Sequence, residues 1–130
     1  KALQETMDAN AQVFRTAESL TKALADIKAL RKRYPDVSVQ DTGATFNTDL
    51  LEAVELGFLL DLAEVVVVGA LNREESRGGH FREDFPTRDD ERFMTHTMAY
   101  SRTTPSGETE IRLETKPVTV TRYQPMERKY

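Results

Sequence analysis

Residues 47–71 constrain the fold more than any other part of the chain, because they are apolar on nearly every side of a helix. Asn47 is a suitable N-cap for such a helix, and Asp49 lies in its first turn. The apolar positions that follow at helical spacing are Leu50, Leu51, Val54, Phe58, Leu62, Val65, Val68 and Leu71. A helix that is apolar all round is normally buried. We therefore predict a long helix from Asn47 to about Glu75, buried at the centre of the domain.

One part of this segment favours a different structure. Residues 65–68 are all valine, and consecutive β-branched residues favour a strand. The residues on either side, 59–64 and 70–75, are mostly good helix formers. A single continuous helix is therefore the better prediction.

Two shorter helices are predicted before the long one. Leu3, Met7, Ala11 and Phe14 recur at about helical spacing and indicate the first. The second has one apolar stripe, made by Leu20, Ala23, Leu24, Ile27, Leu30 and Tyr34. Thr16 would cap this helix, and Pro35 would end it. With a turn-rich connection over residues 35–46, the three helices are expected to form an antiparallel bundle.

After Pro86 the pattern changes from helical spacing to alternation. Residues 93–101 alternate, with Met94, His96, Met98 and Tyr100 on one side, and residues 109–116 alternate more regularly. The turn-forming residues 103–108 between them predict an antiparallel β-hairpin. Residues 117–121 are expected to prolong its second strand, and residues 122–130 to form an extended tail.

Composition narrows the classes of function. The 130 residues contain no cysteine, so no disulfide or thiolate metal site can be built from them, and a net charge of −4 argues against nucleic acid as a partner. The most apolar run, residues 56–71, is interrupted by Asp61 and Glu64 and is shorter than the ~20 residues of a membrane span. We expect one compact unit, with a helical bundle at 1–79 and the charged loop, hairpin and tail at 80–130. Because the chain starts at Lys1 in helical periodicity and without methionine, we also expect it to be a fragment of a longer protein or a processed product.

Residues 72–92, the charged segment, carry the strongest functional signal. Five arginines alternate with carboxylates around Gly78 and Gly79, which are expected to end the long helix. The charged residues are Arg73, Glu74, Glu75, Arg77, Arg82, Glu83, Asp84, Arg88, Asp89, Asp90, Glu91 and Arg92. Arginine pairs with carboxylates through two parallel hydrogen bonds, which fix orientation where surfaces meet. The segment therefore predicts a docking surface, although a solvated loop of scattered ion pairs is the simpler alternative.

Three chemical roles for this segment are weaker alternatives. Ser76 and His80 could form a nucleophile–base pair, but no Gly-x-Ser-x-Gly turn surrounds them. A metal site could be assembled from His80, Asp84, Asp89, Asp90 and His96, although their spacing matches no known metal loop. The glycine pair with Arg77 and Arg82 could bind an anion, but it is not a dinucleotide fingerprint. No catalytic, cofactor-binding or metal-binding residue is therefore assigned.

The charged segment resembles a known family. Residues 75–86 (ESRGGHFREDFP), followed by Arg88, Asp89 and Asp90, are similar to a motif of the succinate dehydrogenase and fumarate reductase flavoprotein subunits. Residues 7–15, residues 47–56 and the Arg128–Tyr130 end also resemble the C-terminal region of that family. The positions carried over, as motif and interface residues, are Arg77, Gly78, Gly79, His80, Arg82, Asp84, Arg88, Asp89 and Asp90.

This resemblance implies a function by association. Such subunits oxidise succinate to fumarate, or catalyse the reverse, with covalently bound FAD. The flavin and substrate sites belong to a preceding region that is absent here, so the chain alone is expected to hold no cofactor and to be inactive. Its implied partners are the FAD domain and the iron–sulfur subunit, with membrane-anchor subunits reached indirectly at the cytoplasmic face. L-Aspartate oxidase has a similar motif, and a free-standing interaction module is a further alternative, but the hairpin and tail favour succinate dehydrogenase.

Overall fold

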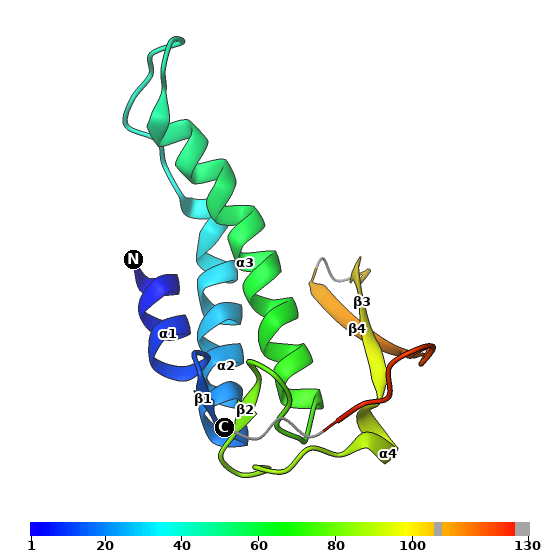
Figure 1. The fold of residues 1–130 in the computed structure, drawn as a ribbon. Coiled ribbons are helices and arrows are strands. Elements are labelled where there is room, and N and C mark those ends of the chain that lie inside the picture. Colours follow the sequence, from blue (N-terminus) through cyan, green and yellow to red (C-terminus); the bar gives the residue numbers. More distant parts are fainter. Residues whose placement is uncertain (106–107, 127–130) are drawn as a thin grey trace.

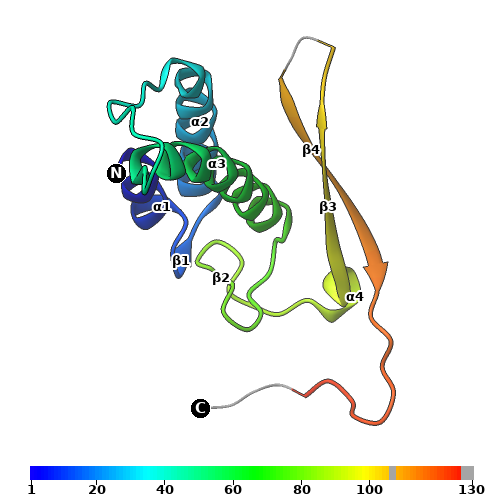
Figure 2. The ribbon, with the colours of Figure 1, turned by 90° about the horizontal axis from the view of Figure 1, so that it is seen from above.

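The computed structural model describes residues 1–105 and 108–126. Three helices lie side by side in chain order: α1 (Ala2–Asn10), α2 (Ala17–Arg33) and α3 (Thr48–Asn72) (Figure 1). An antiparallel hairpin of β3 (Thr95–Thr103) and β4 (Thr109–Pro117) lies on the far side of α3 from α1 (Figure 2). The prediction of a mainly helical domain, with a three-helix bundle followed by a hairpin, is confirmed.

Helix α2, not α3, is the central helix of the bundle. It packs against α1 on one side and α3 on the other. Its Leu20, Ala23 and Ile27 are fully buried, against Leu60 and Val67 of α3. The prediction of a central α3 was wrong because apolar residues all round a helix do not show which side is covered. Only one side of α3 is packed against the bundle.

The starts of the two long helices agree with prediction. The Thr16 hydroxyl accepts a hydrogen bond from the Ser19 N–H at 3.1 Å, and the Ser19 hydroxyl accepts one from the Thr16 N–H, which makes a capping box. Asn47 Oδ1 accepts from the Leu50 N–H at 2.8 Å. Helix α2 ends at Arg33 and is followed by the short 3-10 helix η1 (Tyr34–Asp36), which contains Pro35.

Helix α3 ends at Asn72, three residues earlier than predicted, and Gly78–Gly79 do not cap it. Arg73 leaves the helix with an extended backbone, at φ −88° and ψ 94°. The carbonyls of Ala70 and Leu71 instead accept hydrogen bonds from the Arg82 guanidinium, at 3.0 and 3.2 Å. A distant arginine therefore satisfies the helix end, which local sequence could not indicate. The valine run 65–68 is helical throughout, as predicted.

The first helix is also shorter than predicted. Phe14 is not on a helix but begins β1 (Phe14–Arg15), which pairs in parallel with β2 (Phe81–Arg82). The rings of Phe14 and Phe81 pack edge to face with centroids 5.7 Å apart. This two-residue pairing joins the start of the chain to the charged segment.

The hairpin forms in the predicted region, and its register defines two faces. His96, Met98 and Tyr100 of β3 pair with Lys116, Glu114 and Arg112 of β4 on the outward face. Ile111 and Leu113 lie half-buried on the opposite face. Strand β4 stops at Pro117, so the predicted extension to residue 121 was wrong, and residues 118–126 form neither helix nor strand. Part of the predicted 103–108 turn and the Arg128–Tyr130 end lie outside the described residues.

Within residues 1–105 and 108–126, we find no helix with the length and apolar character needed to cross a bilayer.

Candidate functional site

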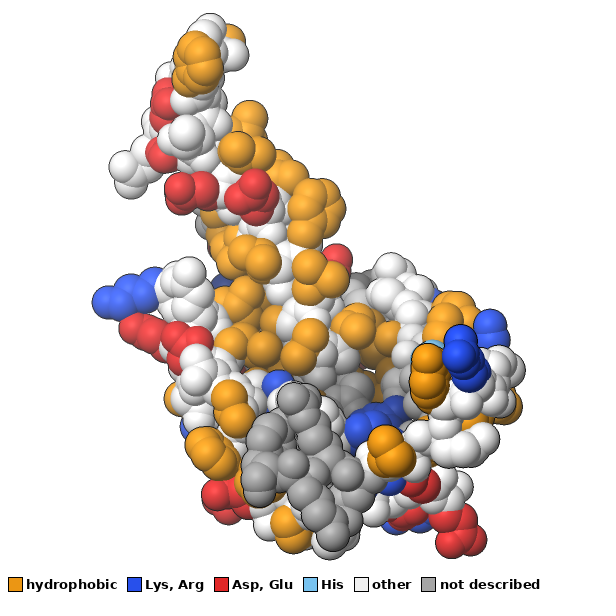
Figure 3. All heavy atoms as spheres, in the orientation of Figure 1, with side chains coloured by type: hydrophobic (Ala, Val, Ile, Leu, Met, Phe, Trp, Pro, Cys, Tyr) orange, Lys and Arg blue, Asp and Glu red, His pale blue; other side chains and the backbone are white. Residues whose placement is uncertain are grey.

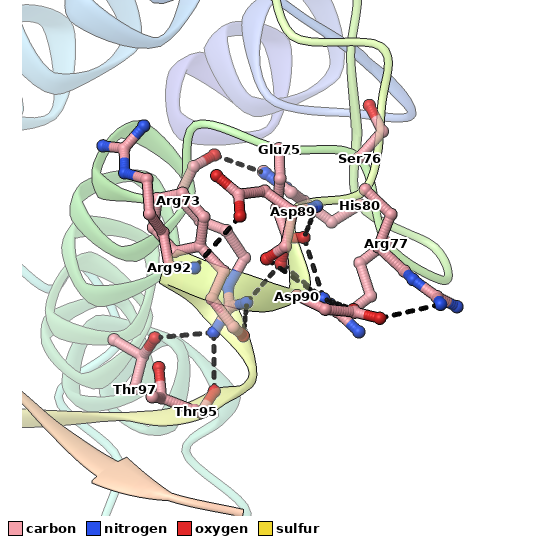
Figure 4. Close-up of polar contacts among 12 residues, drawn as sticks. Arg73, Glu75, Ser76, Arg77, His80, Asp89, Asp90, Arg92, Thr95 and Thr97 are labelled. Carbon is pink, nitrogen blue, oxygen red and sulfur yellow. Dashed lines mark hydrogen bonds and ion pairs between the residues drawn. The ribbon is translucent and has the colours of Figure 1, made fainter. Parts of the chain in front are cut away.

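The charged segment folds around one buried carboxylate, that of Glu75 (Figure 4). Its side chain has no exposed surface. Arg77 binds it through two nitrogens at 2.8 and 3.0 Å, Arg73 donates at 2.6 Å, and the Asp89 N–H donates at 2.8 Å. Burial alone would raise the pKa of Glu75, but these donors outweigh burial and hold the pKa below its usual value. Glu75 is therefore a charged centre about which the segment is ordered.

Arg73 connects this centre to the hairpin. Its guanidinium donates to Glu75, to the Phe93 carbonyl at 2.9 Å, and to the Thr95 carbonyl at 2.9 Å. It also donates to the Thr97 hydroxyl at 3.1 Å (Figure 4). One side chain thus ties the end of α3 to the start of β3, with both acceptor carbonyls held in fixed positions.

Arg77 extends the network outward. Besides Glu75, it donates to Asp90 at 2.6 Å, and Arg88 binds the other oxygen of Asp90 at 2.8 Å. The two arginines lower the pKa of Asp90, with Arg77 as the larger cause. Asp89 contributes in a different way, because its carboxylate accepts from the N–H groups of Glu91 and Arg92 and caps the short helix α4 (Asp90–Phe93).

A second cluster centres on Arg82, whose side chain is only 1% exposed. Besides the two helix carbonyls, Arg82 binds both oxygens of Asp84, at 2.7 and 2.8 Å. Asp84 also accepts from the Ala17 N–H at the start of α2. The Arg82 contact is the main reason that the pKa of Asp84 falls to about 2. Arg82 therefore ties the two long helices together from inside the fold.

His80 lies between the two clusters in a defined tautomer. Arg15 Nη1 lies 2.9 Å from its Nδ1, and the Arg73 carbonyl lies 3.1 Å from its Nε2. Because arginine can only donate, Nδ1 accepts and Nε2 carries the proton. Burial, together with the charges of Arg15, Arg82 and Arg73, lowers the pKa of His80 and favours the neutral ring.

Gly78 and Gly79 form a tight turn that brings His80 back to Arg77. The N–H of each of these flanking residues donates to the carbonyl of the other, at 2.8 and 3.0 Å. Gly78 has a φ of +59°, a backbone conformation that side-chain-bearing residues rarely adopt. The glycine pair thus closes a turn within the charged segment, after α3 has already ended.

The alternative chemical roles find little geometric support. Ser76 does not bond to His80; its hydroxyl accepts from the Arg82 N–H at 2.8 Å and donates to the Phe85 carbonyl at 2.9 Å. Among the described residues, no three His, Asp or Glu side chains converge as metal ligands would. Arg77 and Arg82, the arginines of the possible anion site, both bind carboxylates of this chain.

The structure places most of the residues singled out from sequence in two groups. Arg77, Arg88 and Asp90 share the outer network with Asp89 as a cap, while Arg82 and Asp84 form the inner cluster. His80 lies between them, after the Gly78–Gly79 turn. The motif positions omitted three important residues: Glu75, Arg73 and Arg15. Glu75 and Arg73 were visible as members of the charged alternation, but no local signal connects Arg15 to a histidine 65 positions away.

These features define a helical domain that is folded around its own arginine–carboxylate network. Residues 1–130 match the family model described as "Fumarate reductase flavoprotein C-term". The chain belongs to this family, the C-terminal domain of the succinate dehydrogenase and fumarate reductase flavoprotein subunits.

Relatives carry both enzyme names. The chain is 41% identical over 128 residues to the fumarate reductase flavoprotein subunit of Mycobacterium tuberculosis, covering 98% of this chain and 21% of the relative. It is 44% identical over 119 residues to the succinate dehydrogenase flavoprotein subunit of Rickettsia conorii, covering 92% and 19%. The chain thus spans about a fifth of the length of these relatives.

Solved structures show the same arrangement. A chain of E. coli quinol fumarate reductase aligns with a TM-score of 0.83 and 37% identity, covering 95% of this chain and 21% of that one. Mycobacterium smegmatis Sdh1, in complex with UQ1, aligns with a TM-score of 0.81 and 28% identity, covering 90% and 19%.

Proposed function

We propose that this chain is the C-terminal docking domain of the flavoprotein subunit of a succinate:quinone oxidoreductase. The observation that carries the proposal is the family match over all 130 residues, combined with coverage of only about a fifth of the relatives. The remaining four-fifths of such a polypeptide would hold covalent FAD and the residues that interconvert succinate and fumarate. In this proposal the domain contributes no catalytic group and holds no cofactor of its own.

Its proposed role is to pack on the FAD domain and help to position the iron–sulfur subunit. Through these partners it would lie at the inner face of the membrane, without contacting the anchor subunits directly. The internal bonds of the charged segment support a rigid platform, since Glu75 and Arg82 are satisfied within the chain. Arg88 and Asp90 lie at its periphery with side chains 30% and 40% exposed, and they are the motif residues that we assign to contact with a partner.

Between the two directions of the reaction we favour succinate oxidation, that is, a succinate dehydrogenase. The alternative enzyme, L-aspartate oxidase, is a separate comparison. The hairpin and the residues that follow it support succinate dehydrogenase over that enzyme. The relatives do not separate the two directions, because similar identities are found under both names.

The proposal is tested on the full-length protein. The coding sequence upstream of Lys1 should encode a Gly-x-Gly-x-x-Gly strand–helix unit, and the purified subunit should carry flavin and reduce an artificial acceptor with succinate. A start codon immediately upstream of Lys1 would instead support a free-standing module. Comparing the rates of succinate oxidation and fumarate reduction in the assembled complex tests the preferred direction.

Docking through the periphery of the charged segment has its own test. Arg88→Ala should lower the yield of flavoprotein bound to the iron–sulfur subunit or weaken flavin retention. Arg112→Ala, which removes an exposed arginine paired with Glu114 on the hairpin, is the matched control. If both variants bind the iron–sulfur subunit and retain flavin as well as the wild type does, Arg88 is not part of the interface.

A further inference from the structure

Helix α3 has an outer face of large apolar side chains that nothing else in the described structure covers. The residues of this outer face are Leu50, Leu51, Val54, Phe58, Leu62 and Val66. Most recur at every fourth position, so they lie in one row along the helix, opposite the side that packs on α2. Phe58 and Leu62, near its middle, are 63% and 61% exposed. Figure 3 shows apolar side chains continuing along the length of α3 on the viewed face.

A face of this kind is unusual for a chain that is complete by itself. Contiguous exposed apolar surface marks an interaction site, and apolar interfaces are typical of permanent association. By contrast, the arginines and carboxylates of the charged segment are largely paired within the chain. The surface that most needs a partner is therefore the outer face of α3.

We infer that the preceding part of the same polypeptide covers the outer face of α3, as an interface within the subunit. This inference rests on the proposed function, because the matched relatives are about five times as long as the chain and the matched model is the C-terminal part of the family. It goes further by naming which surface of the domain is covered and by which segment.

The position of the first residue supports this occupant. Lys1 and Leu3 line a groove together with Glu52, Leu56 and Leu59 of α3. Leu59 borders the outer face on the helix surface and is itself exposed. A polypeptide arriving at Lys1 therefore reaches the N-terminal half of α3 directly, which favours a covering surface from the same chain.

The carboxylates along the edge of the outer face indicate the charge expected on the surface that covers it. Asp49, Glu52 and Glu55 are exposed along the same half of α3, and none forms an ion pair with another described residue. The complementary surface is expected to have an apolar centre with lysine or arginine along the side that meets these carboxylates.

The test uses cysteine labelling of the full-length flavoprotein, because residues 1–130 contain no cysteine. Val54→Cys and Phe58→Cys place a thiol on the outer face, and Glu18→Cys, on the exposed first turn of α2, is the matched control. Each variant reacts with a charged maleimide in native and in urea-unfolded protein, and peptide mass spectrometry identifies the labelled site. We expect the outer-face thiols to react at least about tenfold more slowly in the native subunit, and the control thiol to change little.

Other results would overturn the inference. Rapid native labelling of both outer-face thiols means that the face is open, and protection that arises only after the iron–sulfur subunit binds assigns it to that partner. Protection that depends on protein concentration assigns it to a second copy. Rapid labelling in a subunit that still carries flavin and oxidises succinate contradicts this inference but leaves the proposed function intact.

Discussion

The outer face of α3 and the charged segment that follows it differ in opposite ways from what their composition suggests. Along its outer face, apolar side chains such as Phe58 and Leu62 remain exposed. Beyond its C-terminal end, the charged side chains of Glu75 and Arg82 are buried and bonded within the chain. The difference shows that the charged or apolar character of a segment does not reveal where a partner binds. What matters is whether its bonds and contacts are already made inside the domain.

The largest effect is expected at the centre of the charged segment. Glu75→Ala would leave Arg73 and Arg77 without their buried acceptor, which should lower the free energy of unfolding of residues 1–130 by about 3–5 kcal/mol. Glu74→Ala, which affects only the exposed pair with Arg92, should cost less than about 1 kcal/mol. Urea unfolding followed by circular dichroism measures both. Equal losses would show that the network is no more than a solvated surface.

A smaller loss is expected for Arg82→Met. The variant removes the donors to the Ala70 and Leu71 carbonyls, but the Asp84 carboxylate remains accessible to water. We expect a loss of about 2–3 kcal/mol in the same unfolding experiment. Arg92→Met is the exposed control and should change stability by about 0.5 kcal/mol or less. If Arg82→Met left the free energy of unfolding nearly unchanged, the bonds from Arg82 to the last carbonyls of α3 would not stabilise the domain.

The charged segment should also make stability depend on acid pH. The folded pKa of Asp84 is about 2, below its ordinary value of 3.8, so the unfolded chain takes up a proton first as the pH falls. This contribution is fully present above about pH 4 and is lost as the pH falls toward 2. Asp84→Asn should flatten the unfolding free energy over that window. An unchanged pH profile in the variant would exclude Asp84 as its source.

The smallest effect is expected on the outer face of α3. Leu62→Ala should change the stability of residues 1–130 by no more than about 0.5 kcal/mol, because the side chain is already exposed. Leu60→Ala, two positions away and 1% exposed, should cost about 2–5 kcal/mol. If the two losses were similar, the outer face would already be packed within this domain, and the contrast between the two regions would disappear.

Sequence patterns predicted the elements with local signals. Thr16 and Asn47 marked helix starts, and alternation at Ile111 and Leu113 marked a strand. The four valines of α3 were assigned correctly because the residues beside them outweigh their preference for strands. These features depend on residues close together in the chain.

The remaining features depend on distant contacts, which no local pattern contains. The last carbonyls of α3 are bound by Arg82, and Phe14 lies in a strand because it pairs with Phe81. In the candidate site, composition identified the charges correctly, but it could not show that Glu75 lies at their centre. The predicted central position of α3 was wrong for a related reason, because apolar residues all round a helix do not show which side is packed within the domain.

The pairing of β1 with β2 cannot form until both strands have been synthesised. Phe14 of β1 and its partner Phe81 of β2 are 67 positions apart. At the usual speed of translation, roughly 5–20 residues per second, the first partner waits about 3–13 seconds for the second to be synthesised. During that interval the connection between α1 and α2 lacks β2, the strand with which its residues 14–15 pair in the folded domain.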